Sequence, residues 1–420
     1  MVRDPRGPLR GHRPRPGQAE AVATVRAERA NIDVALAWAA AHDPLLGARI
    51  AMGFGWTWVV LGDGVAGAER LRSALAAADT LPRQTRAAGL LVAGWLEASA
   101  GNLARAQADL DEALQIADEL ADTRLRADAD RHRAFLSIQL GRPADVLDLA
   151  SSSITVSRAL RLSWETAAAL VLRAYGSIMV GDTAHAGQDA DEAIHLLDPL
   201  EDSWGLVHAE AMLGAIAQAE HRFGDAAEHL ARAAAQSELL GFVGQAALHL
   251  ASLGRVQQRA GDPHAAILTL NRAILAATDS GDLRLAATAR LHLARLRRTT
   301  GEADAARSLL EQNDRWYQAA GGGEGALLTR CLLAAVDAQN GTGERSQQLL
   351  DILEEGRRVG DPEVQVHPTD ALARLADQRG ELTLARDLLR AADEIAVAAP
   401  HVVDSRDRVD ADHTRAALGL

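Results

Sequence analysis

Three groups of residues in this sequence have side chains and spacings that could do chemistry, and the first is a glycine-rich stretch. Residues 62–67 read Gly-Asp-Gly-Val-Ala-Gly and follow the apolar residues 59–61. A GxGxxG stretch binds the pyrophosphate of a dinucleotide when a strand precedes it and a helix follows it. Here the preceding residues continue a helical pattern, and Gly62 stands at a turn that recurs along the chain. The sequence therefore favours an ordinary turn between helices.

The second group consists of ionisable residues that could hold a metal or act in catalysis. His221 and His229 are eight residues apart, whereas a metal site on one helix needs ligands three or four residues apart and a third convergent group. Asp122, Asp128 and Asp130 lack the glycine and the terminal glutamate of a calcium loop. No serine-histidine-aspartate or cysteine-histidine motif is recognisable. We therefore predict no metal, no cofactor and no catalytic residue.

The third group is a set of aromatic and arginine side chains at one place in a repeat. The residues six positions before each recurring turn are, in order, Trp56, Trp95, Phe135, Tyr175, Ala215, Arg255, Arg295, Ala335 and Arg374. Aromatic residues are only 3% of the chain, yet four of them occupy this place in consecutive repeats. Aromatic rings and guanidinium groups are the commonest anchors of binding surfaces. We predict that the aromatic and arginine members line a ligand-binding concave face, where the arginines pair with carboxylates or phosphates.

The alternative is that these aromatic side chains pack between successive helices as core. A core Trp or Phe replaced by Ala costs about 3–5 kcal/mol of stability. A groove anchor leaves melting nearly unchanged and costs ~2 kcal/mol or more of binding free energy. The sequence does not separate the two, and we expect the second outcome for Trp95 and Tyr175.

The elements that position these residues are set by a regular repeat. Equivalent turns begin at Gly62, Gly101, Gly141, Gly181, His221, Gly261, Gly301, Gly341 and Gly380, with spacings of 39 or 40 residues. Alanine usually follows the turn by five residues and leucine by nine, as in Ala106 and Leu110. A period held this constant indicates an array of repeats.

Small residues recur on the helix that precedes each turn. Seven positions before the turns stand Gly55, Gly94, Ala134, Ala174, Gly214, Gly254, Ala294, Ala334 and Ala373. Small side chains at a fixed place let two helices approach closely while leucines fill the remaining space. We predict an all-α superhelix, or solenoid, of nine helical hairpins of about 40 residues, with helices of roughly 16–19 residues.

This skeleton of small residues resembles the tetratricopeptide repeat over roughly residues 44–397. The unit is longer, at 40 residues against about 34. HEAT and armadillo repeats have a similar period, but no third helix and no regular proline is recognisable here. The resemblance implies tetratricopeptide-like hairpins, with a HEAT-like array as the alternative.

A narrower resemblance lies near the start of the chain. The residues are Glu-Arg-Ala-Asn at 28–31, Ala-Leu-Ala-Trp at 35–38 and Gly-Trp-Thr-Trp at 55–58, followed by Leu61, Gly62 and Leu71. They are similar to the start of the helical sensor region in bacterial regulators of the LuxR and antibiotic-regulatory-protein types and related signal-transduction ATPases. The chain has no GxxxxGK[ST] motif and no lysine, and about 20 residues after the last hairpin are too few for a helix-turn-helix domain. The resemblance therefore implies a sensor or interaction region.

The domain boundaries follow from composition. Residues 1–17 contain five arginines and four prolines and are expected to form a disordered basic arm. Residues 18–42 are expected to form a capping helix, residues 43–399 the solenoid, and the aspartate-rich residues 400–420 an acidic flexible tail.

Composition and charge exclude several classes of function. The net charge of −13 argues against nucleic-acid binding by the body of the protein, and no apolar segment indicates a membrane or secretory signal. The single cysteine fits a cytoplasmic protein. We predict a non-catalytic scaffold that binds a protein, a peptide or a small signal molecule, in a transcriptional or signalling regulator. The alternatives are a purely structural scaffold, a truncated remnant of an NTPase-containing LuxR-type regulator, and an enzyme with catalytic residues that converge only in space.

Overall fold

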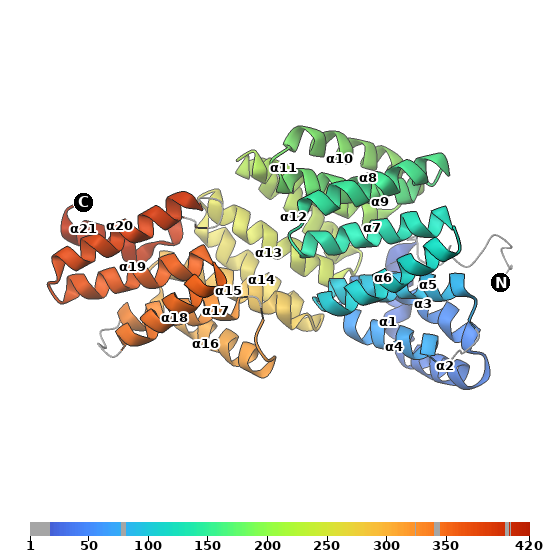
Figure 1. Ribbon diagram of the computed structural model, residues 1–420, viewed down its shortest axis with the longest axis horizontal. Helices are drawn as coiled ribbons and strands as arrows, with labels where there is room; N and C mark the ends of the chain where they lie inside the picture. Colours follow the sequence, from blue (N-terminus) through green and yellow to red (C-terminus); the bar gives the residue numbers. More distant parts are fainter. Residues whose placement is uncertain (1–16, 77–80, 324, 340–344, 400–402, 404) are drawn as a thin grey trace. The chain divides into compact units, whose positions relative to one another are not determined.

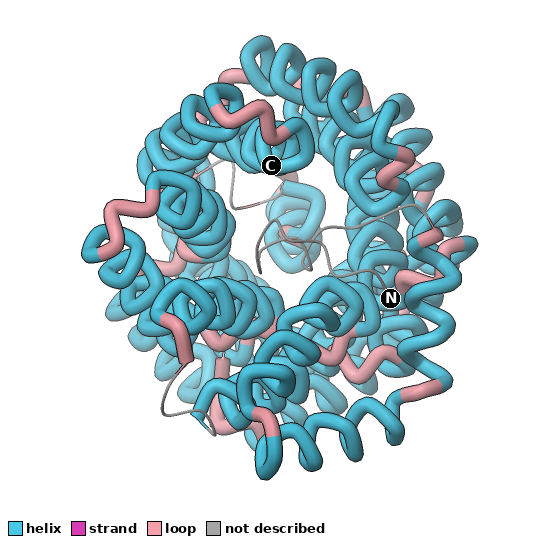
Figure 2. Tube along the Cα trace, turned by 90° about the vertical axis from the view of Figure 1, so that its right-hand side faces the viewer, coloured by secondary structure: helices cyan, strands magenta, loops and turns pink. Residues whose placement is uncertain are grey.

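The computed structural model describes residues 17–76, 81–323, 325–339, 345–399, 403 and 405–420. Throughout these residues the secondary structure is helical, with short turns between helices and no strand (Figure 2). The predicted all-α class is therefore confirmed. The basic arm expected over residues 1–17 lies outside the described residues, apart from Gly17.

The chain folds as two compact units. The first comprises Met1–Ala260 and Leu275–Asp282, and the second comprises Gly261–Ile274 and Leu283–Leu420. Helices of the first unit (Figure 1) are α1 Gln18–Ala27, α2 Arg29–His42, α3 Pro44–Leu61, α4 Gly64–Ala76, α5 Arg83–Ser99, α6 Leu103–Glu119, α7 Thr123–Gln139, α8 Pro143–Ala159, α9 Ser163–Met179, α10 Thr183–Leu197, α11 Ser203–Ala219, α12 Phe223–Leu239 and α13 Val243–Arg259. A short 3₁₀ helix, η2, follows α10 at Asp198–Leu200.

Helix α14, Pro263–Asp279, contributes residues to both units. The second unit continues with α15 Leu283–Thr299, α16 Ala303–Ala319, α17 Ala326–Gln339, α18 Arg345–Val359, α19 Pro362–Gln378, α20 Leu382–Ala398, the 3₁₀ helix η3 Ser405–Asp407 and α21 Val409–Leu418 (Figure 1). The described helices from α3 to α20 follow one another as nine pairs, as the repeat predicts.

The recurring turns owe their regularity to residues in the left-handed backbone region. Gly101 and Gly181 have φ of 84° and 83°, a conformation that glycine adopts without steric cost. His221 takes the same place without being glycine, with φ of 59°. The turns between hairpins use it too, as at Arg161 with φ of 53°. One residue in the left-handed region therefore separates most consecutive helices, many of which have 17 residues. The turn predicted at Gly341 lies outside the described residues.

The small residues before the turns bring paired helices together, as the sequence predicts. A Cβ atom added at Gly94 would lie 2.7 Å from the Leu110 side chain and 3.3 Å from the carbonyl oxygen of Ala106. Gly214 stands in the same relation to Leu230, with a contact of 3.0 Å. The glycine before the turn and the leucine after it recur at a fixed spacing because they form a close contact between the two helices of a hairpin.

Both ends of the described chain differ from the expected boundaries. Residues 18–42 form two helices, because the chain bends at Glu28, with φ of −94° and ψ of 11°. The segment expected to be a flexible acidic tail contains η3 and α21, which pack in the second unit. Its aspartates are ordered because arginines of α15 and α19 pair with them, as described below.

Helix α3 is long and apolar enough to cross a membrane by length and composition. Half of its apolar window is buried inside the protein, and the side chains of Met52, Trp56 and Trp58 lie within the core of the first unit. A buried core helix of a soluble protein has the same composition, and the packing of α3 is that of a core helix.

Candidate functional site

Aromatic side chains of the first unit gather where early and late helices of that unit meet. The helices run in order from α3 to α13, and α3 then packs against α13. A Cβ atom added at Gly244 in α13 would lie 3.6 Å from both the carbonyl oxygen of Val60 and the amide nitrogen of Gly62. This contact joins residues about 180 positions apart in the sequence, so it brings together side chains from hairpins that are not neighbours.

The gathered side chains form what we call the aromatic cluster: Trp56, Trp95, His132, Trp164, Trp204, His208, Phe242 and His249. Trp56 meets Phe242 edge to face, with ring centroids 5.8 Å apart. Trp204 meets Trp95 edge to face at 6.0 Å and stacks on Trp164 at 6.3 Å. The cluster continues from Trp204 to His208 at 4.5 Å, and from His208 to His249 at 6.2 Å. Such ring pairs add about 0.5–1.5 kcal/mol each beyond their buried area.

Helix α1 packs against this cluster through one face. Gln18, Val22 and Val25 are spaced by four and three residues, so they lie on one side of the helix, and all three are buried. The Gln18 amide donates from Nε2 to Asp202 Oδ1 at 2.5 Å, while its Oε1 accepts from the backbone N–H of Trp204 at 2.8 Å. Helix α1 thus contacts the cluster through the Gln18 amide and the Val22 side chain.

Asp202 is held by neutral donors at the N-terminus of α11. Its second oxygen accepts from the Trp164 indole Nε1 at 2.8 Å, and its side chain is 1% exposed. The positive end of the helix dipole favours a carboxylate at this position. The Gln18 amide therefore donates to a carboxylate and accepts from a backbone N–H that has no partner within its own helix. A ligand amide could make the same two hydrogen bonds.

Four ring nitrogens of the cluster are buried and have no hydrogen-bond partner among the described residues: Trp56 Nε1, Trp204 Nε1, His208 Nε2 and His249 Nε2. Burial lowers the pKa of His208 to about 4. Burial, together with the charge that His208 would carry, lowers the pKa of His249 to about 3. Both imidazoles are therefore neutral at pH 7, and their ring nitrogens can exchange hydrogen bonds with a polar ligand group.

The structure brings two of the four predicted aromatic residues into the cluster. Trp56 is only 7% exposed, and Trp95 is half-buried. Phe135 packs instead on the apolar core built by α3 to α7. Tyr175 is half-buried beside the apolar side chains of α9 to α11, and burial raises the pKa of its phenol to about 12. The aromatic ladder is therefore divided between the cluster and its supporting core.

The predicted arginines are also divided. Arg255 is exposed in the first unit. In the second unit, Arg295 donates to Glu363 Oε1 and to Asp407 Oδ2, each at 2.7 Å. Arg374 donates to Asp410 Oδ1 at 2.9 Å. The carboxylates expected to come from a ligand are thus supplied at Arg295 and Arg374 by the chain itself.

Sequence reasoning missed most of the cluster, although part of it left a signal. Trp164 and Trp204 are 40 residues apart, so they occupy the same place, the second residue of a first helix. The 40-residue spacing of these two tryptophans is the signal in the sequence that identifies them as a pair. Gln18, Phe242, His208 and His249 have no aromatic or amide counterpart at the same place in the other repeats, so the repeat spacing does not identify them.

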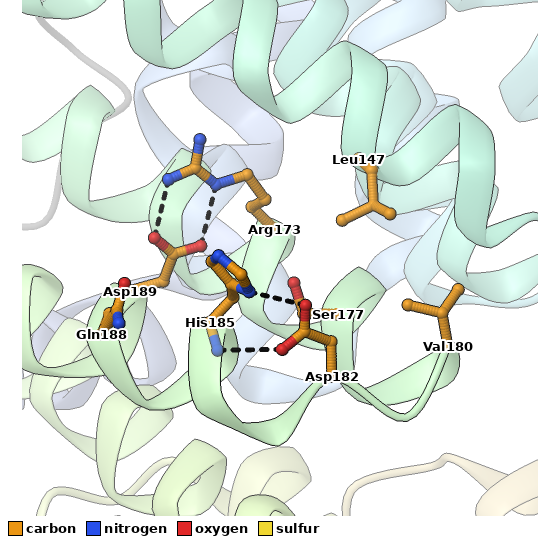
Figure 3. Close-up of a pocket in the computed structure, with 8 residues that line it drawn as sticks. All are labelled: Leu147, Arg173, Ser177, Val180, Asp182, His185, Gln188 and Asp189. Atoms are coloured by element: carbon orange, nitrogen blue, oxygen red, sulfur yellow. Dashed lines mark hydrogen bonds and ion pairs between the residues drawn. The ribbon is translucent and has the colours of Figure 1, made fainter.

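A separate hollow of about 340 Å³ lies between α8, α9 and α10 (Figure 3). It is lined by Leu147, Arg173, Ser177, Val180, Asp182, His185, Gln188 and Asp189. Arg173 donates to both oxygens of Asp189, at 2.8 and 2.7 Å, and His185 lies 2.6 Å from Asp182. Its charged groups therefore pair with one another (Figure 3), and the hollow includes none of the predicted site residues.

Among the residues that the structure describes, no three His, Cys, Asp or Glu side chains are placed to hold a metal ion. His221 stands at a turn and His229 lies 3.0 Å from Glu210 Oε1 in α11, so the two histidines have separate surroundings.

No protein-family model matches the chain, and no curated protein matches it. Solved structures do match. A Rap protein complexed with Competence and Sporulation Factor has a TM-score of 0.54 at 15% identity, over 80% of this chain and 87% of that one. The quorum sensor NprR from B. thuringiensis, in its apo form, has a TM-score of 0.55 at 11% identity, over 80% and 97%.

A signal-transduction ATPase with a tetratricopeptide repeat sensor, from Pyrococcus horikoshii, matches with a TM-score of 0.54 at 12% identity. That match covers 79% of this chain and 52% of the ATPase. At these identities the similarity establishes the fold: the protein is a tetratricopeptide-like helical repeat protein.

Proposed function

We propose that the protein is a non-catalytic scaffold that binds a peptide or protein segment at the aromatic cluster of its first unit. The observation that carries the proposal is the set of four buried ring nitrogens without a partner. Buried polar groups are nearly always hydrogen-bonded, and the exceptions need an explanation. A segment with backbone carbonyls and an amide side chain would supply these partners, while the surrounding rings take its apolar side chains.

The contacts of helix α1 support one kind of ligand chemistry for the cluster. The Gln18 amide donates to Asp202 and accepts from the Trp204 N–H. A ligand amide could make the same pair of bonds, and the neutral His208 and His249 rings would not repel a cation or attract an anion strongly. The proposal therefore favours a polar but uncharged anchor beside apolar side chains.

The regulatory setting is part of the same proposal. The structural neighbours include a Rap protein complexed with Competence and Sporulation Factor, a quorum sensor and an ATPase with a tetratricopeptide repeat sensor. Together with the resemblance of residues 28–71 to the start of LuxR-type sensor regions, they support a sensor or interaction module of a cytoplasmic bacterial regulator. A small signal molecule in place of a peptide would use the same cluster.

The second candidate is a purely structural scaffold, and the burial of Trp56 favours it. A ring that is 7% exposed and packed against Phe242 already has an apolar partner. In that case the cluster is the core of the first unit, and the predicted anchors contribute stability without contacting a ligand.

A peptide selection on the full chain separates the two candidates. Peptides from a random library are selected on the immobilised protein and their affinities are measured by calorimetry. The proposal predicts that Trp95→Ala weakens the selected peptides by ~2 kcal/mol or more, whereas Trp316→Ala, a matched half-buried tryptophan of the second unit, leaves them unchanged. Equal affinities for wild type and Trp95→Ala, or no selected peptide at all, would leave the structural scaffold as the function.

A further inference from the structure

The second unit holds a group of arginines that face one short segment near the end of the chain. Arg295 and Arg298 lie one turn apart on α15, and Arg374 lies on α19. Arg298 Nη2 donates to Asp410 Oδ2 and Arg374 Nη1 donates to Asp410 Oδ1, both at 2.9 Å. We call Arg295, Arg298 and Arg374 the arginine cluster.

The segment that covers the arginine cluster carries charges of both signs in a fixed order. Asp407 pairs with Arg295, and Asp410 pairs with Arg298 and Arg374. Between them, Arg408 donates to both oxygens of Asp370, at 2.9 and 2.7 Å, and to Asp393 at 2.5 Å. The body of the unit therefore presents positive, negative and positive groups to the sequence Asp-Arg-Val-Asp at 407–410.

This contact differs from that of a helix that merely caps the end of a repeat array. A cap covers the last repeat only. The segment 407–410 instead reaches α15, whose arginines precede it by 112 residues, as well as α19. α15 belongs to the seventh hairpin and α19 to the ninth, so the segment lies across first helices of separate repeats, where repeat proteins bind their partners.

Charge and hydrogen bonding, more than apolar burial, hold the segment. The buried side chains of α21 are Asp410, Ala411 and Thr414, of which only Ala411 is apolar. Asp410 is 2% exposed and Arg298 is 5% exposed. Burial and the nearby guanidinium groups of Arg295, Arg298 and Arg408 hold the pKa of His367 well below its ordinary value, which indicates a strongly positive surrounding.

The energetic cost of leaving buried arginines unpaired restricts which segments can bind to this surface. Buried guanidinium groups left without a counter-charge are strongly destabilising, because nothing then offsets their desolvation. Arg298 and Arg374 share Asp410 as their carboxylate among the described residues. Only a segment that brings carboxylates to the same places can replace residues 407–410.

We propose that the arginine cluster, with Asp370 and Asp393, is a second binding site, which takes a protein segment of the pattern acidic-basic-any-acidic that leads into a helix. The chain's own residues 407–410 occupy this site as an exchangeable intramolecular ligand, and a partner segment of the same pattern displaces them. The site is independent of the aromatic cluster and of the function proposed for it.

The test uses a labelled synthetic peptide of residues 405–420 and the full chain, with binding followed by fluorescence anisotropy. In a chain carrying Asp407→Asn and Asp410→Asn, the internal segment no longer competes. We expect this variant to bind the peptide at least about tenfold more tightly than the wild type, because tethering gives the internal segment a high effective concentration.

Two further variants make the result specific. A peptide with the same two aspartates replaced by asparagine should not bind, whereas a peptide with Asp412→Asn, whose carboxylate is mostly exposed, should bind as tightly as the unchanged one. Adding Arg298→Gln and Arg374→Gln to the chain should abolish binding. Equal binding of all peptides, or no binding to the double asparagine variant, would overturn the proposal.

Hydrogen exchange of the wild-type chain provides an independent readout. An exchangeable segment opens by itself, so the amides of α21 should exchange while those of α19 remain protected. If α21 exchanges only when α19 does, or if the double asparagine variant fails to fold, then residues 407–410 are a fixed part of the unit and the proposal is wrong.

Discussion

In each unit a helix near one end of the described chain lies against a cluster of side chains, but the kind of contact differs. In the first, the N-terminal helix α1 lies against the aromatic cluster through Gln18 and Val22. Its polar contacts join the Gln18 amide to Asp202 and to the Trp204 N–H, and Arg26 to the carbonyl oxygen of Gly241. In the second, η3 and α21 lie against the arginine cluster through Asp407 and Asp410. A single repeat architecture thus presents an apolar surface with amide-sized hydrogen bonds in one unit and a charged surface in the other. The position six residues before the turn contributes Trp56 and Trp95 to the first surface and Arg295 and Arg374 to the second.

The comparison predicts that the stability of the aromatic cluster depends on buried apolar area, and removal of its most buried tryptophan should have the largest effect. Trp56→Ala should lower the free energy of unfolding by about 3–5 kcal/mol, because the ring is packed against Phe242 and Val60. Trp38→Ala is the matched control, since that tryptophan is 53% exposed and should change stability by less than about 0.5 kcal/mol. Denaturant titration measures both. Equal effects would show that the Trp56 ring is not part of the core.

The histidines of the aromatic cluster should make the first unit sensitive to acid. The folded pKa of His208 is lowered to about 4 and that of His249 to about 3, from 6.5. Between pH 6.5 and 4 the unfolded chain therefore binds more protons than the folded chain, so stability falls as the pH falls through this window. The loss should be on the order of 3–5 kcal/mol per histidine when complete.

A variant with His208→Phe and His249→Phe isolates this effect from other titrating groups, including His367. Its unfolding free energy should fall less steeply with decreasing pH than that of the wild type, while its stability at pH 7 is retained, because two unpartnered ring nitrogens are removed. The measurement is unfolding by denaturant at several pH values. Parallel profiles for the two proteins would contradict the burial of the neutral imidazoles.

The arginine cluster should respond to the loss of one charge rather than of buried area. Asp410→Asn removes the carboxylate shared by Arg298 and Arg374 and should lower the local opening free energy of α21 by about 3–5 kcal/mol, as for a broken buried ion pair. Asp412→Asn is the control, because its side chain is 64% exposed. Amide exchange of α21 measures the change. A loss of protection that extends equally over α19 would show that the segment is not a separable element.

The turns common to both units should give the smallest effect. Arg161→Gly replaces a non-glycine residue at φ of 53° with the residue that adopts this conformation freely. It should stabilise the first unit by up to about 1 kcal/mol, since the left-handed region costs other residues about 1–2 kcal/mol and glycine loses more entropy on folding. Thermal melting of Arg161→Gly beside Gly181→Ala, which should be destabilising, checks both signs.

Much of the fold could be predicted because it is local. The glycine turns, the alanine and leucine after them and the small residue before them describe contacts within one hairpin, such as Gly94 against Leu110. The turn at His221 was found by spacing alone, although histidine gives no sign of a left-handed backbone. The predicted period then gave the order of helices and their lengths.

The site could be predicted only in part, because it depends on contacts between distant hairpins. Gln18 meets Asp202 across 184 residues, and Arg295 meets Asp407 across 112. Such contacts depend on the small rotation between successive repeats, which the residue pattern does not determine. The repeat identified Trp56, Trp95, Arg295 and Arg374 as candidates, but it could not show that the two ends of the chain pack against them.

The central claim is that charge holds the C-terminal segment and apolar packing holds the N-terminal helix. Amide exchange of α1 and α21 in one sample, at low salt and at about 1 M NaCl, tests it most directly, since the Debye length falls to about 3 Å at the higher concentration. The account predicts that salt accelerates exchange in α21 and leaves α1 unchanged. Equal responses of the two helices, or faster exchange in α1 alone, would contradict it.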